Sequence, residues 1–204
     1  MADAALQPRS AFAGLLVAAG NGRGVTVIDR DGLGLATLAS RRGRLEELSA
    51  AIRNHFGIEL PAGPARTVSG AVAMAGTSPG IWLASRERGA NGFAAELRAA
   101  AGAAASVTDQ SDGYGVLRVQ GQMVRTVLAK LVPVDLHARA FPVGRCASSI
   151  ASHMGVTFWR LEDAGGWPVF EIAVFRSLAA SFWRALSESA AEYGLAIAGE
   201  SRAR

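Results

Sequence analysis

The sequence has a single cysteine, Cys146, and a single lysine, Lys130, and charged residues make up only 19% of its 204 positions. One cysteine cannot form an intrachain disulfide, so a disulfide-built secreted scaffold is excluded and a cytoplasmic location is expected. Low-complexity linkers are also missing, and the hydrophobic share of 50% excludes an intrinsically disordered chain. We therefore expect one compact domain over residues 1–204, with enough apolar side chains to form a core.

The surplus of positive charge is modest and dispersed. A formal net charge of +4 and a sequence pI of about 10.2 are compatible with nucleic-acid binding. The arginines are scattered, however, with one dense group at Arg41, Arg42 and Arg44, and no basic stripe with stacking aromatic residues is found. We expect no nucleic-acid partner.

An apolar segment, Ala11–Gly20, resembles the hydrophobic region of a signal peptide, but Asp3 and a single preceding arginine do not fit such a leader. It is also far shorter than the roughly 20 residues that span a bilayer. We expect it to form a buried strand or a packed N-terminal segment, and we expect no membrane partner.

The hydrophobic pattern predicts short strands and amphipathic helices in the repeated order strand, strand, helix. Runs at Val25–Arg30 and Leu33–Ala39 flank Asp31-Gly32, a dipeptide typical of a hairpin. Apolar residues recur at helical spacing from Leu45 to Phe56, and Gly57 follows where a C-cap is expected.

Later segments continue this order and predict an α+β fold, in which antiparallel sheets carry helices on one face. Strands are predicted at 67–75, 81–85, 106–110, 114–119, 146–153, 156–161 and 168–174, and helices at 91–104 (capped by Asn91), 122–131 and 177–193.

We assign no catalytic, cofactor-binding or metal-ligating residue from the sequence. The glycine-rich segment 20–24 runs into a predicted strand rather than opening a helix, so it is interpreted as a turn and not as a phosphate loop. Asp135 and His137 share one side of an extended segment, but a zinc site needs three or four ligands. Cys146 has no neighbouring histidine or predicted helix N-terminus, which favours a small core residue over a nucleophile. An Asp-Gly turn explains Asp112.

The closing helix, Ser177–Tyr193, has an unusually narrow polar stripe, and aromatic residues concentrate in this third of the chain. Two interpretations are open. The helix lies deep in its own fold, or it presents a second apolar face to another chain, as the enrichment of aromatic residues in interface cores suggests.

Three segments carry a resemblance to a known family: Val107–Gly113 (VTDQSDG), Val116–Gly121 (VLRVQG) and Val127–Cys146 (VLAKLVPVDLHARAFPVGRC). Together with the strand around Trp159 and the FWRAL sequence of the closing helix, they resemble the gamma subunit of heterotetrameric sarcosine oxidase. The block PVDLHARAFPVGRCA is the most specific part of the resemblance, which extends over about residues 106–194.

The resemblance implies a subunit of a cytoplasmic complex that oxidatively demethylates sarcosine to glycine and passes the one-carbon unit to tetrahydrofolate. It also implies alpha, beta and delta partner subunits, on which FAD, FMN, NAD, zinc and tetrahydrofolate are expected, and a gamma chain that binds none of them. The implied fold is similar to the folate-binding aminomethyltransferase domain, in keeping with the antiparallel sheets predicted above.

We therefore predict a non-catalytic structural subunit that docks onto larger partners. Phe141, Pro142 and Arg145 belong to a rigid, partly apolar segment that ends in a bidentate donor for a partner carboxylate. Trp159 and Trp183 are the predicted aromatic interface residues. Two alternatives are an equivalent subunit of a related N-methyl amino acid dehydrogenase, such as N-methylglutamate dehydrogenase, and a stand-alone folate-binding transferase-like protein.

Overall fold

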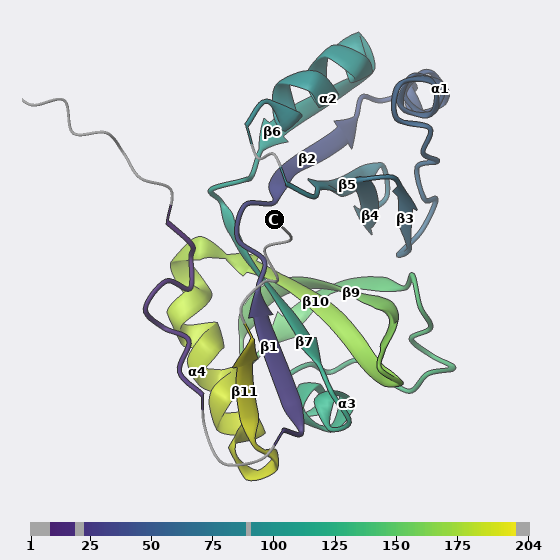
Figure 1. Ribbon diagram of the computed structural model, residues 1–204. Coiled ribbons are helices and arrows are strands. Elements are labelled where there is room, and N and C mark those ends of the chain that lie inside the picture. Colours follow the sequence, from purple (N-terminus) through teal and green to yellow (C-terminus); the bar gives the residue numbers. More distant parts are fainter. Residues whose placement is uncertain (1–8, 19–22, 89–90, 199–204) are drawn as a thin grey trace, which may run out of the picture.

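The computed structural model describes residues 9–18, 23–88 and 91–198, which form two β-sheets with helices on their outer faces (Figure 1). The strands of the six-stranded sheet lie in the order β11 (Leu195–Ala198), β1 (Val25–Asp29), β7 (Tyr114–Gln120), β10 (Trp167–Phe175), β9 (Met154–Ala164) and β8 (Cys146–Ala151). Those of the five-stranded sheet lie in the order β3 (Arg66–Ser69), β4 (Val72–Ser78), β5 (Ile81–Arg86), β2 (Gly34–Ser40) and β6 (Ala105–Asp109). Neighbouring strands are antiparallel, as predicted, except for the parallel pair β1 and β11.

Each sheet packs one face on its own helices and the other face on the opposite sheet, because side chains alternate between the two faces of a strand. The helices of the five-stranded sheet are α1 (Leu45–Phe56) and α2 (Phe93–Ala101), and those of the six-stranded sheet are α3 (Val124–Ala129) and α4 (Ala179–Ala190). The inner faces meet in a third cluster, formed by Leu33, Leu35, Ala75, Leu83, Val116, Cys146, Trp159 and Ala173. The result is a four-layer arrangement, in which the two sheets form the middle layers (Figure 1).

The hairpin predicted around Asp31-Gly32 is wrong. β1 pairs with β7 and β11, whereas β2 pairs with β5 and β6, so Asp31-Gly32 carries the chain from one sheet to the other. The Asp112-Gly113 turn between β6 and β7 makes a second crossing in the same way. A hairpin would have left Arg30 at a solvated turn, but between the sheets Arg30 is buried and paired with carboxylates.

The helix predicted over Leu45–Phe56 is confirmed, and Gly57 ends it in the left-handed conformation, with φ of 63° and its N–H donating to the Arg53 carbonyl oxygen. The predicted strand at 67–75 is two strands, β3 and β4, joined at Gly70. Asn91 does not cap α2, whose N-cap position is Gly92. The short strand β11 was not predicted, because its four residues show no alternation of polar and apolar side chains.

The segment from Ala11 packs on the fold as a turn, and not as a strand. Phe12 is buried in the cluster under the six-stranded sheet, and Leu15 and Leu16 pack against that cluster. Residues 19–22 lie outside the described part of the chain, and with them most of the glycine-rich turn predicted at 20–24. No helix in the described ranges has the length and hydropathy needed to cross a bilayer.

Replacing Gly57 tests the predicted helix end. An alanine at this left-handed position carries a steric penalty, so we expect Gly57→Ala to lower the free energy of unfolding by about 1 kcal/mol in urea titrations. Gly155→Ala is the matched control, since a Cβ at Gly155 meets open space and no left-handed conformation is required there. Equal destabilisation by both substitutions would contradict this account.

Candidate functional site

The structure buries three of the five residues predicted to lie at an interface. Phe141 stacks on Phe158, with ring centroids 5.2 Å apart, inside the core of the six-stranded sheet. Trp159 is 2% exposed and lies between the two sheets. Trp183 faces the same core as Phe141 from α4. The docking role expected for these side chains is therefore corrected, because they fill the protein's own interior.

The closing helix lies deep in its own fold, the first of the two interpretations given above. Its large apolar side chains, Phe182, Trp183 and Leu186, are buried against the six-stranded sheet, whereas Ser181 and Arg184 are exposed. The narrow polar stripe is thus explained by deep packing within the chain.

Pro142 and Arg145 remain accessible on an ordered loop, together with Val143, which the sequence pattern did not single out. We call Pro142–Arg145 the docking loop. Val143 is 45% exposed, which is uncommon for a valine held in an ordered turn. The proline before it and the glycine after it form a turn that aims its side chain outward.

Backbone hydrogen bonds fix the docking loop to both sheets. The Arg145 N–H donates to the Pro142 carbonyl oxygen at 3.0 Å, and the Gly144 N–H donates to the carbonyl oxygen of Arg160 in β9 at 2.9 Å. From the five-stranded sheet, the Arg66 N–H donates to the Gly144 carbonyl oxygen at 2.6 Å. The loop therefore has a preformed shape at the junction of the sheets.

Glu171 forms the centre of a buried charge cluster between the sheets. The Nε atoms of Arg30 and Arg118 donate to its Oε1 at 2.9 and 3.0 Å, and Nη2 of Arg118 donates to the same oxygen at 2.7 Å. The indole Nε1 of Trp159 donates to Oε2 at 2.9 Å. Three of these bonds end on Oε1 and one on Oε2, so both carboxylate oxygens are held by donors of the same chain.

Two further groups complete this charge cluster. Arg30 also pairs with Glu87, at 2.5 Å, and the guanidinium of Arg66 lies 5.8 Å from the centre of the Trp159 ring. Burial lowers the pKa of Arg66, and the nearby carboxylates of Glu171 and Glu87 oppose that effect. The charged groups around Glu171 thus come from the six-stranded sheet (Arg118), from the first crossing (Arg30) and from the five-stranded sheet and its margin (Arg66 and Glu87).

Cys146 is a core residue, as the sequence favoured. Its Sγ donates to the carbonyl oxygen of Gly76 at 3.0 Å, and burial raises the pKa of the thiol to about 11. The thiol is protonated at neutral pH and is therefore a poor nucleophile.

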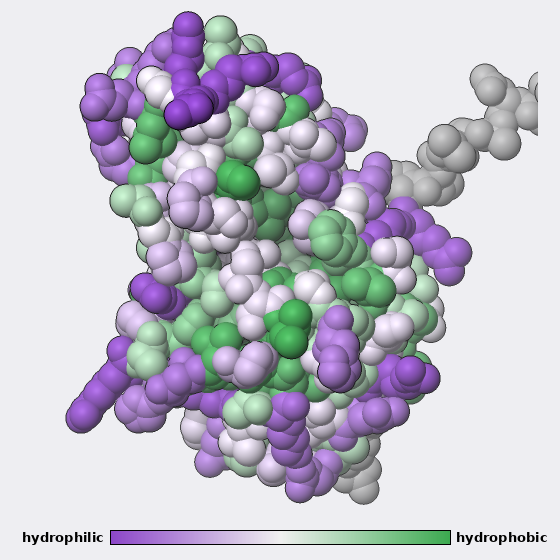
Figure 2. Space-filling model, turned by 180° about the vertical axis from the view of Figure 1, so that it is seen from behind, coloured by the Kyte–Doolittle hydropathy of each residue, from purple (hydrophilic) through white to green (hydrophobic). Residues whose placement is uncertain are grey.

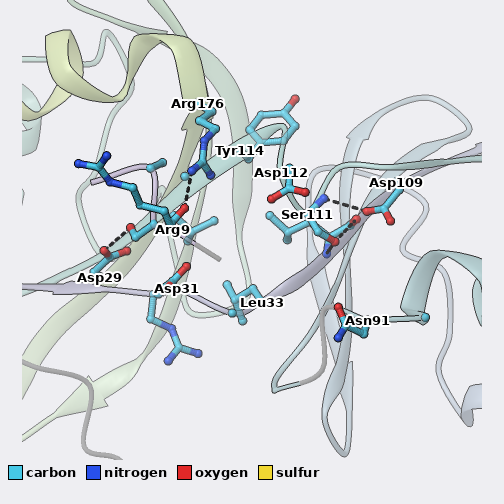
Figure 3. A pocket seen from close by; sticks show the side chains of 18 residues that line it. Arg9, Asp29, Asp31, Leu33, Asn91, Asp109, Ser111, Asp112, Tyr114 and Arg176 are labelled. Atoms are coloured by element: carbon cyan, nitrogen blue, oxygen red, sulfur yellow. Dashed lines mark hydrogen bonds between the residues drawn. The ribbon is translucent and has the colours of Figure 1, made fainter. Parts of the chain in front are cut away.

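A cavity of about 970 Å³ opens beside the two crossings (Figure 3). Arg9, Asp29 and Arg176 lie on one side of it, and Asn91 and Asp109 lie on the other. Leu33 lies between the two groups, and the phenol of Tyr114, whose pKa is raised by burial, lies at the margin. The cavity thus presents charges of both signs over a partly apolar floor.

Hydrogen bonds within the chain hold the cavity walls. Ser10 Oγ donates to Asp29, and Arg176 donates to the carbonyl oxygen of Arg9. Asp109 accepts the Ser111 N–H at 2.9 Å, and Ser111 Oγ bonds to the backbone of Leu35. These polar groups shape the walls, and the space between them is large enough for a small polar molecule or a peptide segment.

His137, weighed above as a zinc ligand with Asp135, and His55 both take part in local contacts. Asp135 accepts the backbone N–H of His137 at 2.8 Å, as in an Asx turn, and His137 Nδ1 accepts the Arg139 N–H. His55 lies 3.2 Å from Glu96 on the surface. Within the part of the chain that the structure describes, no three histidine, cysteine or acidic side chains are grouped as a metal site requires.

These observations define a class of protein, namely an α+β protein of two helix-covered sheets that are joined by paired buried charges and carry an exposed, preformed loop. Residues 44–192 match the model of the sarcosine oxidase, gamma subunit family, and the chain belongs to that family.

Two relatives are similar in sequence, and both bear the name sarcosine oxidase subunit gamma. The protein from Arthrobacter sp. is 34% identical over 117 residues, which cover 56% of this chain and 57% of that relative. The protein from Corynebacterium sp. (strain P-1) is 34% identical over 130 residues, which cover 62% of this chain and 63% of that relative. The matches thus span about three fifths of the relatives' own lengths.

Solved structures agree on the fold. A chain of the heterotetrameric sarcosine oxidase from Corynebacterium sp. U-96, in complex with pyrrole 2-carboxylate, superposes with a TM-score of 0.79 at 24% identity, over 91% of this chain and 95% of that chain. The glycine cleavage system aminomethyltransferase T from Bartonella henselae superposes with a TM-score of 0.56 at 14% identity, over 86% of this chain and 47% of that chain. The predicted likeness to the aminomethyltransferase fold is confirmed.

Removing the central carboxylate, Glu171, should lower the free energy of unfolding. Glu171→Ala leaves the buried Arg30 with Glu87 alone and removes the carboxylate from the partly exposed Arg118, and we expect a loss of about 3 kcal/mol in the free energy of unfolding in urea. Glu47→Ala, which removes an exposed pair with Arg44, is the control and should cost less than about 1 kcal/mol. Similar losses in the two variants would show that the buried cluster does not hold the sheets together.

The raised pKa of Cys146 predicts a dependence of stability on pH. The folded thiol keeps its proton up to about pH 11, whereas the unfolded thiol loses it near 9.0, so its contribution is complete below pH 9 and is lost between pH 9 and 11. Urea titrations at pH 8 and 10 measure this change, and Cys146→Ala should show a smaller decrease than the unsubstituted protein. Equal decreases would refute the assignment.

Proposed function

We propose that this chain is a non-catalytic structural subunit of a heterotetrameric sarcosine oxidase that oxidatively demethylates sarcosine to glycine in the cytoplasm. The observation that carries the proposal is membership of the gamma subunit family over residues 44–192. The Corynebacterium enzyme whose chain shares this fold is a heterotetramer, and this supports the expected assembly.

The state of the buried polar groups supports a structural role. Both oxygens of Glu171 accept hydrogen bonds from the same chain, and Cys146 holds its proton at neutral pH. General acid–base and nucleophilic chemistry need groups that can exchange protons with a substrate, and these two residues are committed to stabilising the interior. We propose that alpha, beta and delta partner subunits carry the FAD, FMN, NAD, zinc and tetrahydrofolate of the complex.

The docking loop is the contact surface in this proposal. Pro142 and Val143 offer apolar surface in a fixed conformation, and Arg145 offers a planar donor for two hydrogen bonds. A preformed loop loses little conformational entropy on binding. Its partner is therefore a subunit surface with a small apolar pocket next to a carboxylate.

Co-expression with sarcosine oxidase alpha, beta and delta subunits tests the assembly. The unsubstituted chain should co-purify with the flavin-containing chains, and Arg145→Glu should weaken this association at least tenfold because it places a carboxylate against a carboxylate. Arg42→Glu makes the same charge change at an exposed site before α1 and should leave the association unchanged. Failure of the unsubstituted chain to associate would overturn the proposed function.

Substrate assays on the assembled complex distinguish a sarcosine oxidase from the related N-methylglutamate dehydrogenase. Oxidation of sarcosine in preference to N-methylglutamate is the expected result. The reverse preference would assign the chain to the related dehydrogenase complex.

The cavity at the crossings favours one second candidate, a stand-alone folate-binding protein. Its volume of about 970 Å³ lies within the range of small-molecule sites. Titration calorimetry of the isolated chain with tetrahydrofolate measures this directly. Under the main proposal no heat of binding is expected, and saturable heat that disappears in Asp112→Ala would favour the folate-binding candidate instead.

A further inference from the structure

Strand β8 forms one edge of the six-stranded sheet, and among the described strands it pairs with β9 alone. In an antiparallel pair, alternate residues direct their backbone N–H and C=O groups toward the partner strand, and the residues between them direct these groups to the outer side. The Arg160 N–H donates to the Arg145 carbonyl oxygen. The odd-numbered residues of β8 therefore direct their backbone N–H and C=O groups toward β9. The even-numbered residues of β8 direct their backbone N–H and C=O groups to the side away from β9.

The ends of this outer edge already have backbone partners. The Cys146 N–H donates to the Pro64 carbonyl oxygen at 3.0 Å, and the Ser152 N–H donates to the Leu131 carbonyl oxygen at 3.1 Å. Between them, the outward groups of Ser148 and Ile150 make no backbone hydrogen bond with any described residue. Ser148 is exposed, and Ile150 is 51% exposed over Gly155, where a side chain is missing. We call Ser148–Ile150 the open edge.

Both edges of the five-stranded sheet are guarded, as natural edge strands usually are. On β6, at the edge of the five-stranded sheet, Arg98 reaches over from α2 and donates to the Val107 carbonyl oxygen at 3.1 Å. On β3, the Arg66 N–H is already bonded to Gly144. Strand β8 has no lysine, proline or inward-pointing charge between Cys146 and Ala151 that would discourage a further strand.

The surroundings of the open edge restrict what can bind there. Backbone donors and acceptors at strand spacing fit an extended polypeptide segment. Two basic side chains flank this strand in the chain, Arg145 just before it and His153 just after it, and both are exposed; residues 141–155 contain no aspartate or glutamate. A segment that carries carboxylates is therefore favoured by charge.

A second copy of this chain is a poorer occupant. Its own β8 brings no acidic residue, and pairing over two outward residues falls short of the roughly 1,200 Å² that a stable interface buries. A larger partner that is already held at the docking loop, which immediately precedes β8, would present such a segment at high effective concentration. Hydrophobic surface on the lobe of the six-stranded sheet, visible from behind in Figure 2, is in keeping with contact to a partner.

We propose that an extended, acidic segment of a partner subunit adds a strand to the six-stranded sheet at Ser148 and Ile150. This inference rests on the proposed function, because it takes the partner to be a subunit of the same complex. The segment forms backbone hydrogen bonds with the open edge, covers Ile150, and directs a carboxylate to Arg145.

Amide hydrogen exchange in the assembled complex tests the proposal. In the peptide that spans Cys146–Ala151, the amides of Ser148 and Ile150 should exchange at least tenfold more slowly in the complex than in the free chain. Ser148→Pro removes one outward N–H without removing a bond to β9, and should weaken association at least tenfold. Ser148→Ala keeps that N–H and loses the contact of Ser148 Oγ with Thr157, so it should bind within twofold of the unsubstituted chain.

A pair of substitutions at Ile150 tests the charge of the segment without altering the backbone. Ile150→Asp should weaken association more than Ile150→Lys does. Unchanged exchange at Cys146–Ala151 in an intact complex would overturn the strand addition and leave the proposed function standing, and equal effects of the two Ile150 variants would overturn the acidic character of the segment. If the unsubstituted chain forms no complex, the proposed function fails, and the partner of the open edge fails with it.

Discussion

The arrangement of this protein depends on one buried carboxylate. Glu171 accepts hydrogen bonds from Arg30, Arg118 and Trp159, and through Arg30 it is linked to Glu87. A buried charge is tolerated when every lone pair is matched, and an unmatched one is costly. Because the donors come from β7, β9 and the crossing between the sheets, their relative positions are fixed together. Because Arg30 also pairs with Glu87, which follows β5, the charge cluster links the six-stranded sheet to the five-stranded sheet.

The positions of the cavity, the docking loop and β8 follow from this arrangement of the sheets. Burial of Arg30 requires β1 and β2 to diverge into different sheets, and the second crossing at Asp112-Gly113 follows beside the first. The cavity forms along these crossings, where the chain leaves one sheet before it enters the next. Outside the cavity, the docking loop bridges the sheets through Gly144, and β8 begins directly after it. The surfaces proposed to bind partners thus adjoin β9, whose Trp159 belongs to the charge cluster.

Sequence patterns predicted the elements more successfully than their partners. The spacing of Leu48 and Ile52 and the glycine at position 57 identify α1, because both signals are local. The Asp31-Gly32 dipeptide is an equally local signal, but the hairpin it predicted is wrong. The pairing of β1 with β7 depends on residues about ninety positions apart in the chain. Of the predicted interface residues, Pro142 and Arg145 are on the surface, whereas Phe141, Trp159 and Trp183 are buried. Composition identifies an aromatic residue and does not identify which side of a sheet it occupies.

The sequence by itself determined the helices, most of the strands, the absence of a disulfide and, through the segment around PVDLHARAFPVGRC, the resemblance to the gamma subunit family. The tertiary structure alone decided that the strands form two sheets, that Glu171 is shared by two arginines, and that β8 keeps an outward edge at Ser148 and Ile150. The physical reason is the range of the interactions. Periodicity and turn chemistry act within a few residues, whereas strand pairing and charge burial depend on groups that meet only when distant segments fold together.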